Sequence, residues 1–237
     1  MMAYGRKISV VFALFILMAN FHSNVAASEL VDLELVLAVD CSYSVDNVEY
    51  KLQMKGLANA FRSPKVRDLI NSGLVGTIAV TVIQWSKWDV QIPVIPWRKI
   101  SSDGDILELS ADLLKQPRMA ADGGTSLGGI ITFSQKSLAE NKYIGARQVI
   151  DISSDGQDNS GNAPDAAAKY AVASGIIING LAILNEFRSL DKYFEQRIIG
   201  GPGAFVIKAN DYYNYEEAIL KKLIKEISPR FISFNSP

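Results

Sequence analysis

Residues 33–44 of the chain read LELVLAVDCSYS, a run of apolar residues that ends in an acid and two alternating serines. Because Leu33 to Val39 is almost entirely apolar, we expect a strand buried on both faces, as in the centre of a parallel sheet. Asp40 then lies at the carboxyl end of that strand, where a carboxylate without a compensating charge or donor would be costly. The stretch therefore predicts a central strand with a polar site at its end.

Beyond this strand, short apolar runs alternate with amphipathic stretches along the rest of the chain. That alternation is typical of a mostly parallel sheet covered by helices. We expect helices over 47–62, 106–114, 126–140, 163–174, 191–198 and 215–227. We expect strands over 33–39, 77–85, 90–97, 148–152, 176–184 and 204–207. Asp46 and Glu49 have the spacing of a capping box at the start of the first helix.

Two of these strands are joined by a connection that is too short for a crossover helix. Only residues 86–89 separate the strands over 77–85 and 90–97, so the two must pair antiparallel. Pro93 and Pro96 place the second of them at the edge of the sheet. The expected fold is a doubly wound α/β fold, with a mostly parallel sheet, one antiparallel edge strand and helices on both faces.

The first 27 residues have the layout of an export signal. Arg6 and Lys7 precede an apolar core over 8–19, and Val25-Ala26-Ala27 forms a small-residue cleavage site. We expect a signal peptide over 1–27, then one domain over 28–237 with a short C-terminal tail, exported to the periplasm or secreted. The alternative is an uncleaved signal that anchors the same domain to the membrane. No later segment of the sequence is long and apolar enough to cross a membrane.

Composition excludes several classes of function. The 24 basic and 25 acidic residues give a net charge of −1, and losing the two basic residues of the signal leaves −3. Basic residues are neither in excess nor clustered, which argues against a nucleic-acid partner. His22, the only histidine, lies in the signal, so histidine-based catalysis and the usual zinc and copper sites are excluded. Cys41, the only cysteine, is expected to be a small buried residue that faces away from Asp40.

Three loops carry hydroxyl or carboxylate side chains at the expected ends of strands or helices. They hold Asp40, Ser42 and Ser44 after the first strand, Thr125 before the helix over 126–140, and Asp155 after the strand over 148–152. Because the carboxyl ends of parallel strands meet at one edge of a sheet, we expect these side chains to lie together. Two carboxylates and three hydroxyls suit a hard divalent cation, Mg²⁺ first, with Mn²⁺ or Ca²⁺ as alternatives. With only two negative charges, the site would leave a position open for an anionic group.

This three-part pattern resembles the metal-ion-dependent adhesion site of von Willebrand factor A domains, and the resemblance covers about residues 33–227. It implies that Asp40, Ser42, Ser44, Thr125 and Asp155 hold the cation directly or through water. It also implies that an Asp or Glu carboxylate of a protein partner completes the coordination. The chain is similar in particular to an uncharacterised group of exported bacterial A-type proteins. The expected function is an exported, metal-dependent, adhesion-type binding module and not an enzyme.

Two other functions stay open at this point. A Mg²⁺-dependent hydrolase could use Asp40 as its nucleophile, although the second acid expected two residues later is Ser42. A structural domain with a vestigial metal site is the other. Single residues also have simpler roles: Thr125 could cap the helix that follows, and Asp158 and Asn159 could shape the loop behind Asp155. The oligomeric state is left open, as is any partner contact by the tryptophans and tyrosines at positions 85, 88, 97, 212, 213 and 215.

Overall fold

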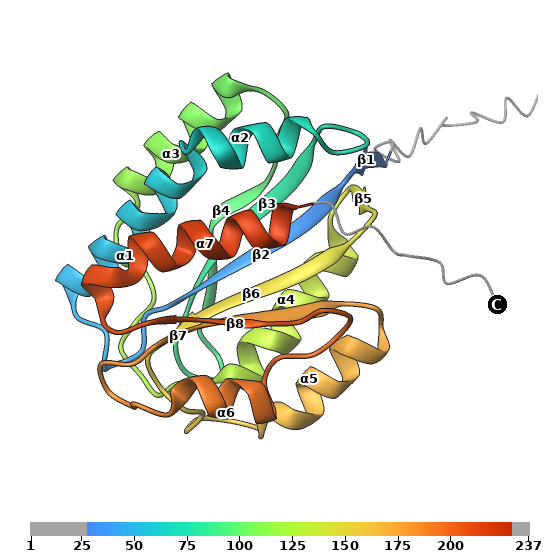
Figure 1. The fold of residues 1–237 in the computed structure, drawn as a ribbon. Helices are drawn as coiled ribbons and strands as arrows, with labels where there is room; N and C mark the ends of the chain where they lie inside the picture. Colours follow the sequence, from blue (N-terminus) through green and yellow to red (C-terminus); the bar gives the residue numbers. More distant parts are fainter. Residues whose placement is uncertain (1–27, 229–237) are drawn as a thin grey trace, which may run out of the picture.

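A six-stranded sheet lies between two layers of helices in the computed structural model, which describes residues 28–228 (Figure 1). The strand order is β4-β3-β2-β6-β7-β8. These strands are β2 (Leu33–Asp40), β3 (Ile78–Trp85), β4 (Gln91–Ile100), β6 (Gln148–Ser154), β7 (Ile177–Ile183) and β8 (Val206–Ala209). A separate parallel pair consists of β1 (Glu29–Val31) and β5 (Tyr143–Gly145). The expected signal peptide, residues 1–27, lies outside the described residues.

The pairing of the strands confirms the expected fold class. β2 pairs in parallel with β3 and β6, and β6–β7 and β7–β8 are also parallel. β3 and β4 pair antiparallel, and β4, which carries Pro93 and Pro96, is the antiparallel one of the two edge strands. All eight residues of β2 are buried, as the apolar run predicted.

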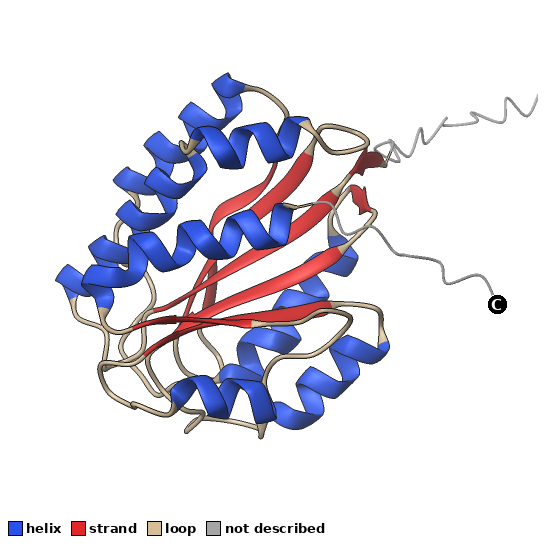
Figure 2. Ribbon diagram, in the orientation of Figure 1, coloured by secondary structure: helices blue, strands red, loops and turns tan. Residues whose placement is uncertain are grey.

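The helices cover both faces of the sheet, four on one face and three on the other (Figure 2). The first face carries α1 (Asn47–Phe61), α2 (Pro64–Asn71), α3 (Asp103–Lys115) and α7 (Tyr215–Ile227), which follows the short 3₁₀ helix η1 (Tyr212–Asn214). The second face carries α4 (Leu127–Glu140), α5 (Pro164–Ala173) and α6 (Leu190–Arg197). Alternation along β2 divides the core accordingly, because Leu35 and Leu37 pack toward α1 and α7, whereas Val36 and Ala38 pack toward α4.

The start of α1 is fixed by the capping box that the sequence predicted. Asp46 Oδ1 accepts hydrogen bonds from the backbone N–H groups of Val48 and Glu49, at 2.7 and 2.8 Å. In return, Glu49 Oε2 accepts from the backbone N–H of Asp46 at 2.8 Å. The capping box therefore fixes the end of the loop over residues 41–46, which connects β2 to α1.

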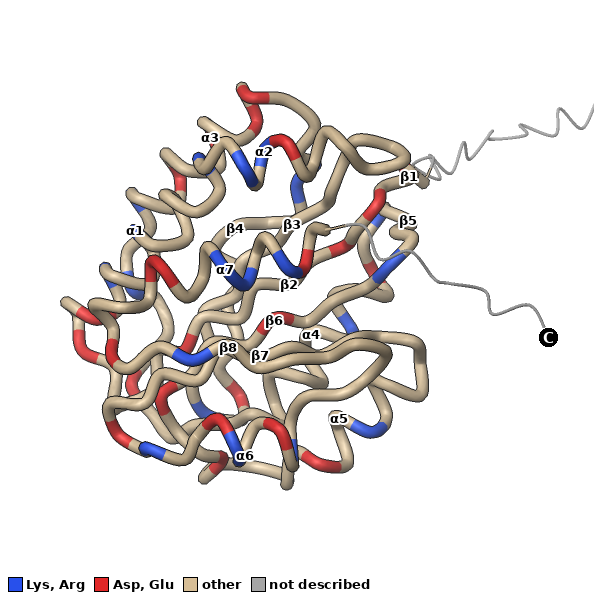
Figure 3. Tube along the Cα trace, viewed as in Figure 1, with Lys and Arg blue, Asp and Glu red and all other residues tan. Residues whose placement is uncertain are grey.

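The loops after β2 and β6 and the start of α4 lie at the carboxyl edge of the parallel strands. The described chain begins at the other edge, just before β1, and α7 ends on that same side of the molecule (Figure 1). Lys and Arg are spread over helices on both sides of the sheet in the view of Figure 3. No helix within residues 28–228 is long and apolar enough to cross a membrane.

Candidate metal site

The two carboxylates of the expected site meet because their strands are neighbours. Asp40 ends β2 and Asp155 follows β6 directly, and both residues are fully buried. Asp40 Oδ1 accepts the backbone N–H of Ser42 at 2.7 Å, and Oδ2 accepts the hydroxyl of Ser154. Asp155 Oδ1 accepts the hydroxyl of Ser44 at 2.7 Å, while its buried Oδ2 has no hydrogen-bond partner among residues 28–228.

The three expected hydroxyls lie beside these carboxylates. The Oγ atoms of Ser42 and Ser44 are 3.3 Å apart, and Ser44 bonds directly to Asp155. Thr125 packs against the loop after β6, since a Cβ added to Gly156 would lie only 2.9 Å from Thr125 Oγ1. The structure thus brings together all five residues that the sequence singled out. Their role as metal ligands stays a prediction.

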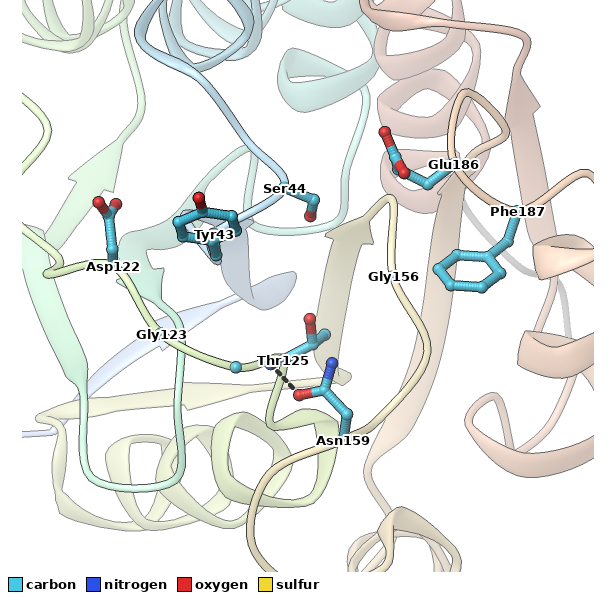
Figure 4. A pocket seen from close by; sticks show the side chains of 10 residues that line it. Tyr43, Ser44, Asp122, Gly123, Thr125, Gly156, Asn159, Glu186 and Phe187 are labelled. Carbon is cyan, nitrogen blue, oxygen red and sulfur yellow. Dashed lines mark hydrogen bonds between the residues drawn. The ribbon is translucent and has the colours of Figure 1, made fainter.

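The loop that carries Thr125 is tied to the loop that carries Asp155. Asn159 Oδ1 accepts the backbone N–H of Thr125 at 2.8 Å, as the dashed line in Figure 4 marks, and Asn159 N–H donates to Thr125 O at 2.9 Å. Asp158 Oδ1 accepts the backbone N–H of Leu127 at 2.7 Å at the start of α4. The side chains of Asp158 and Asn159 therefore hold these two loops together. Helix α4 begins at Leu127, one residue later than expected, because Ser126 is its N-cap.

The loop after β2 is held from both sides by residues that the sequence analysis did not single out. Gln53 on α1 donates to the backbone oxygen of Asp40 at 3.0 Å. Arg118 donates to the backbone oxygen of Cys41 at 2.9 Å and is itself paired with Asp122 at 2.6 Å. No local motif marks a glutamine or an arginine for such a role, because their partners are backbone atoms brought near by the fold. Cys41 is buried in the core on the α1 and α7 side, as predicted.

Burial makes the two carboxylates electrostatically costly. Burial, together with the nearby charge of Asp155, raises the pKa of Asp40 to about 7, against the hydrogen bonds from Ser154 and Ser42. Burial also raises the pKa of Asp155. Within residues 28–228, neither carboxylate forms an ion pair with a Lys or Arg. Two buried acids that form no ion pair are an arrangement that a bound cation would stabilise.

An open pocket of about 440 Å³ lies over this cluster (Figure 4). Ser44, Thr125 and Gly156 line it, whereas Asp40 and Asp155 lie beneath its surface. Tyr43 stands on one side of the opening and Phe187, from the loop between β7 and α6, stands on the other. The loop with Phe187 was not expected here, because it carries none of the three parts of the sequence pattern.

The raised pKa of Asp40 predicts a pH-dependent stability for the metal-free protein. An acid whose pKa is higher in the folded than in the unfolded chain destabilises the fold above the folded value, and this penalty is relieved as the pH falls. Relative to Asp40→Asn, we expect the free energy of unfolding of the wild type to rise as the pH falls from about 7 toward 3.8. The difference between the proteins should change by up to ~1.4 kcal/mol per pH unit. Urea unfolding in EDTA measures it, and parallel pH profiles for the two proteins would contradict the prediction.

Sequence and structure comparisons place the chain among known proteins. The family described as "Protein of unknown function (DUF1194)" matches residues 30–231. A comparison with curated protein sequences gives no match.

Among solved structures, the chain is similar to proximal thread matrix protein 1 from the mussel byssus with a zinc-occupied metal-ion-dependent adhesion site, at 20% identity and a TM-score of 0.61. The match covers 84% of this chain and 48% of that protein. The chain is also similar to the pilus adhesin SpaC from Lactobacillus rhamnosus GG, at 17% identity and a TM-score of 0.60. This match covers 85% of this chain and 31% of that chain. A von Willebrand factor type A structure from Catenulispora acidiphila is similar at 18% identity and a TM-score of 0.57. That match covers 85% of this chain and 43% of that chain. The chain thus spans about half of the byssus protein and a third of the adhesin, and the likeness confirms the A-type fold.

Proposed function

The chain belongs to the family described as "Protein of unknown function (DUF1194)", and from its site we propose that it is a metal-dependent, adhesion-type protein-binding module. One observation carries the proposal. Asp40 and Asp155 are fully buried side by side, without an ion-pair partner among residues 28–228, beneath a pocket to which Ser44 and Thr125 contribute hydroxyl groups. The expected signal peptide over 1–27 supports action outside the cytosol.

In this proposal, Asp40, Ser42, Ser44, Thr125 and Asp155 hold one divalent cation, Mg²⁺ in the first place. The donors fit such an ion, because all five side chains offer oxygen. The buried Oδ2 of Asp155, which has no hydrogen-bond partner within residues 28–228, can bind a cation or its water through one of its two lone pairs. The site has only two carboxylates, and residues 28–228 contain no cluster of three or more His, Cys, Asp or Glu side chains arranged to hold a metal. The cation would therefore depend on hydroxyls and water, and its charge would be no more than neutralised by the protein.

A cation of this kind attracts one further anionic ligand, and we propose that a carboxylate from a protein partner supplies it. The pocket gives such a group access at Ser44 and Thr125, which line it. Two similar structures, a byssal matrix protein with a zinc-occupied adhesion site and a pilus adhesin, support an adhesive role. No reaction is proposed, because Ser42 occupies the position where an Asp-based hydrolase needs its second acid.

Partner capture tests the proposed function. Immobilised wild-type protein should retain a partner from an envelope extract in Mg²⁺, and EDTA or Asp40→Ala should abolish retention. A short blocked peptide with one Asp, added in excess, should compete with the partner, whereas the same peptide with Asn in its place should not. Capture that survives both EDTA and Asp40→Ala would refute metal-dependent binding. Equal competition by the two peptides would refute the role of a carboxylate.

A further inference from the structure

Three tyrosines at the start of α7 differ sharply in their surroundings. Tyr213 is 79% exposed, whereas Tyr212 and Tyr215 are 2% and 0% exposed. The buried hydroxyl of Tyr215 lies 3.2 Å from the hydroxyl of Ser153 on β6. The hydroxyl of Tyr212 is also buried, but it has no hydrogen-bond partner in the described part of the chain. A polar group buried without a partner is uncommon in folded proteins and calls for an explanation.

The environment of Tyr212 follows from the alternation of side chains along β6. Asp151 and Ser153 face α7, where Lys222 Nζ lies 2.6 Å from Asp151 Oδ1 and Tyr215 meets Ser153. The next residue in this alternation along β6 is Asp155, and the next buried polar side chain of the η1–α7 segment, after Lys222 and Tyr215, is Tyr212. Asp155 is accordingly the charge with the largest effect on the Tyr212 hydroxyl, ahead of Asp40. The polar contacts between this segment and β6 thus run up to the metal site.

Tyr212 offers a buried hydrogen-bond donor, and Asp155 offers a buried acceptor. Asp155 Oδ1 accepts the hydroxyl of Ser44, but its buried Oδ2 is outside hydrogen-bond geometry with every donor of the described residues. Tyr212 Oη is a buried donor in the same situation, yet it lies close enough to oppose the rise that burial causes in the pKa of Asp155. Within residues 28–228, no ion pair competes for Asp155.

We propose that Tyr212 is a positioning residue of the metal site, whose hydroxyl serves Asp155 Oδ2 as a donor and fixes the orientation of this carboxylate. The inference rests on the proposed function, because it concerns the same cation. Ser44 holds Asp155 from one side and Tyr212 holds it from the other. Tyr212 itself does not touch the cation. Groups that orient metal ligands in this way typically change metal affinity about 10- to 100-fold when they are removed.

Substitution of single hydroxyls tests this role. Tyr212→Phe and Tyr215→Phe each remove one buried hydroxyl from the same segment without changing the ring. Calorimetric titration with Mn²⁺ should show about 10- to 100-fold weaker binding in Tyr212→Phe. Tyr215→Phe should bind like the wild type, as should Tyr213→Phe, because neither hydroxyl faces Asp155. Urea unfolding of all variants without metal separates a loss of stability from a loss of affinity.

A spectroscopic readout adds a measurement that a purely structural role would not change. Mn²⁺ should perturb the near-ultraviolet tyrosine absorption of the wild type and of Tyr215→Phe, and this difference signal should disappear in Tyr212→Phe. If the wild type binds Mn²⁺ and Tyr212→Phe binds it equally or more tightly, the inference is overturned while the proposed function stands. An equal loss of affinity in Tyr212→Phe and Tyr215→Phe would also overturn it. A wild type that binds no divalent cation would overturn the proposed function itself.

Discussion

Saturating Mg²⁺ will raise the free energy of unfolding of the wild-type protein, and Asp40→Ala will abolish this gain. A ligand that binds only the folded state stabilises it by ~2.7 kcal/mol at a concentration 100 times its dissociation constant. Asp40 supplies one of the two negative charges at the site, and burial has already raised its pKa to about 7. Urea unfolding in Mg²⁺ and in EDTA, followed by tryptophan fluorescence, measures the gain in each protein.

Asp46→Ala is the matched control for this experiment. Asp46 is an exposed acid on the same loop, and its carboxylate caps α1. Its removal should reduce stability by ~1 kcal/mol through the lost cap. The response to Mg²⁺ should remain, because Asp46 has no part in the site. A gain from Mg²⁺ that is as large in Asp40→Ala as in the wild type would show that the ion acts elsewhere.

Lys222→Met should destabilise the protein by ~3–5 kcal/mol, the usual effect of removing one partner of a buried ion pair. Lys222 is fully buried, and its Nζ lies 2.6 Å from Asp151 Oδ1 and 2.7 Å from Glu226 Oε1. Without it, two buried carboxylates would face each other. Burial and the charge of Glu226 already raise the pKa of Asp151 well above its ordinary value, and the ammonium group opposes that rise. Urea unfolding near neutral pH measures the loss.

Lys221→Met provides the comparison for this substitution. Lys221 is the preceding residue on α7, and it pairs with Glu217 at 2.6 Å on an exposed surface. Such pairs contribute at most ~1 kcal/mol, so Lys221→Met should have little effect. Asp151→Asn added to Lys222→Met removes one of the unpaired carboxylates and should recover part of the lost stability. Equal effects of the two lysine substitutions would contradict the importance of the buried cluster.

The main sheet could be predicted because its decisive residues carry local signals. The apolar run over 33–39 indicates a strand buried on both faces, and the short connection over 86–89 leaves only an antiparallel pair. The site followed from one topological rule, since Asp40, Thr125 and Asp155 each stand at the end of a strand or the start of a helix. These signals do not depend on distant parts of the chain.

Other elements are defined only by tertiary contacts, and the sequence analysis did not predict them. Helix α2 buries only Val66 and Ile70, too few for a periodic pattern. Strands β1 and β5 have three residues each, and their pairing joins segments far apart in sequence. An acid at position 151 within an apolar strand was a signal for a buried ion pair, but nothing in the sequence distinguishes Lys222 as its partner from Lys221.

The same limit applies around the metal site. The sequence shows three tyrosines near the start of α7, but only the fold buries Tyr212, where the charge of Asp155 acts on its hydroxyl, and leaves Tyr213 exposed. Ser154 was part of the predicted loop, yet its hydrogen bond to Asp40 depends on the register between β2 and β6. The sequence therefore identified the groups that could hold a cation, and the fold identified those that position them.

Calorimetric titration of the purified wild-type protein with Mg²⁺ and Mn²⁺ tests the central claim most directly, namely that five oxygen-bearing side chains hold one divalent cation. We expect saturable binding of one ion per chain, lost in Asp40→Ala while the circular dichroism spectrum stays that of the wild type. The absence of saturable heat with both ions, or equal binding by wild type and Asp40→Ala, would contradict the claim.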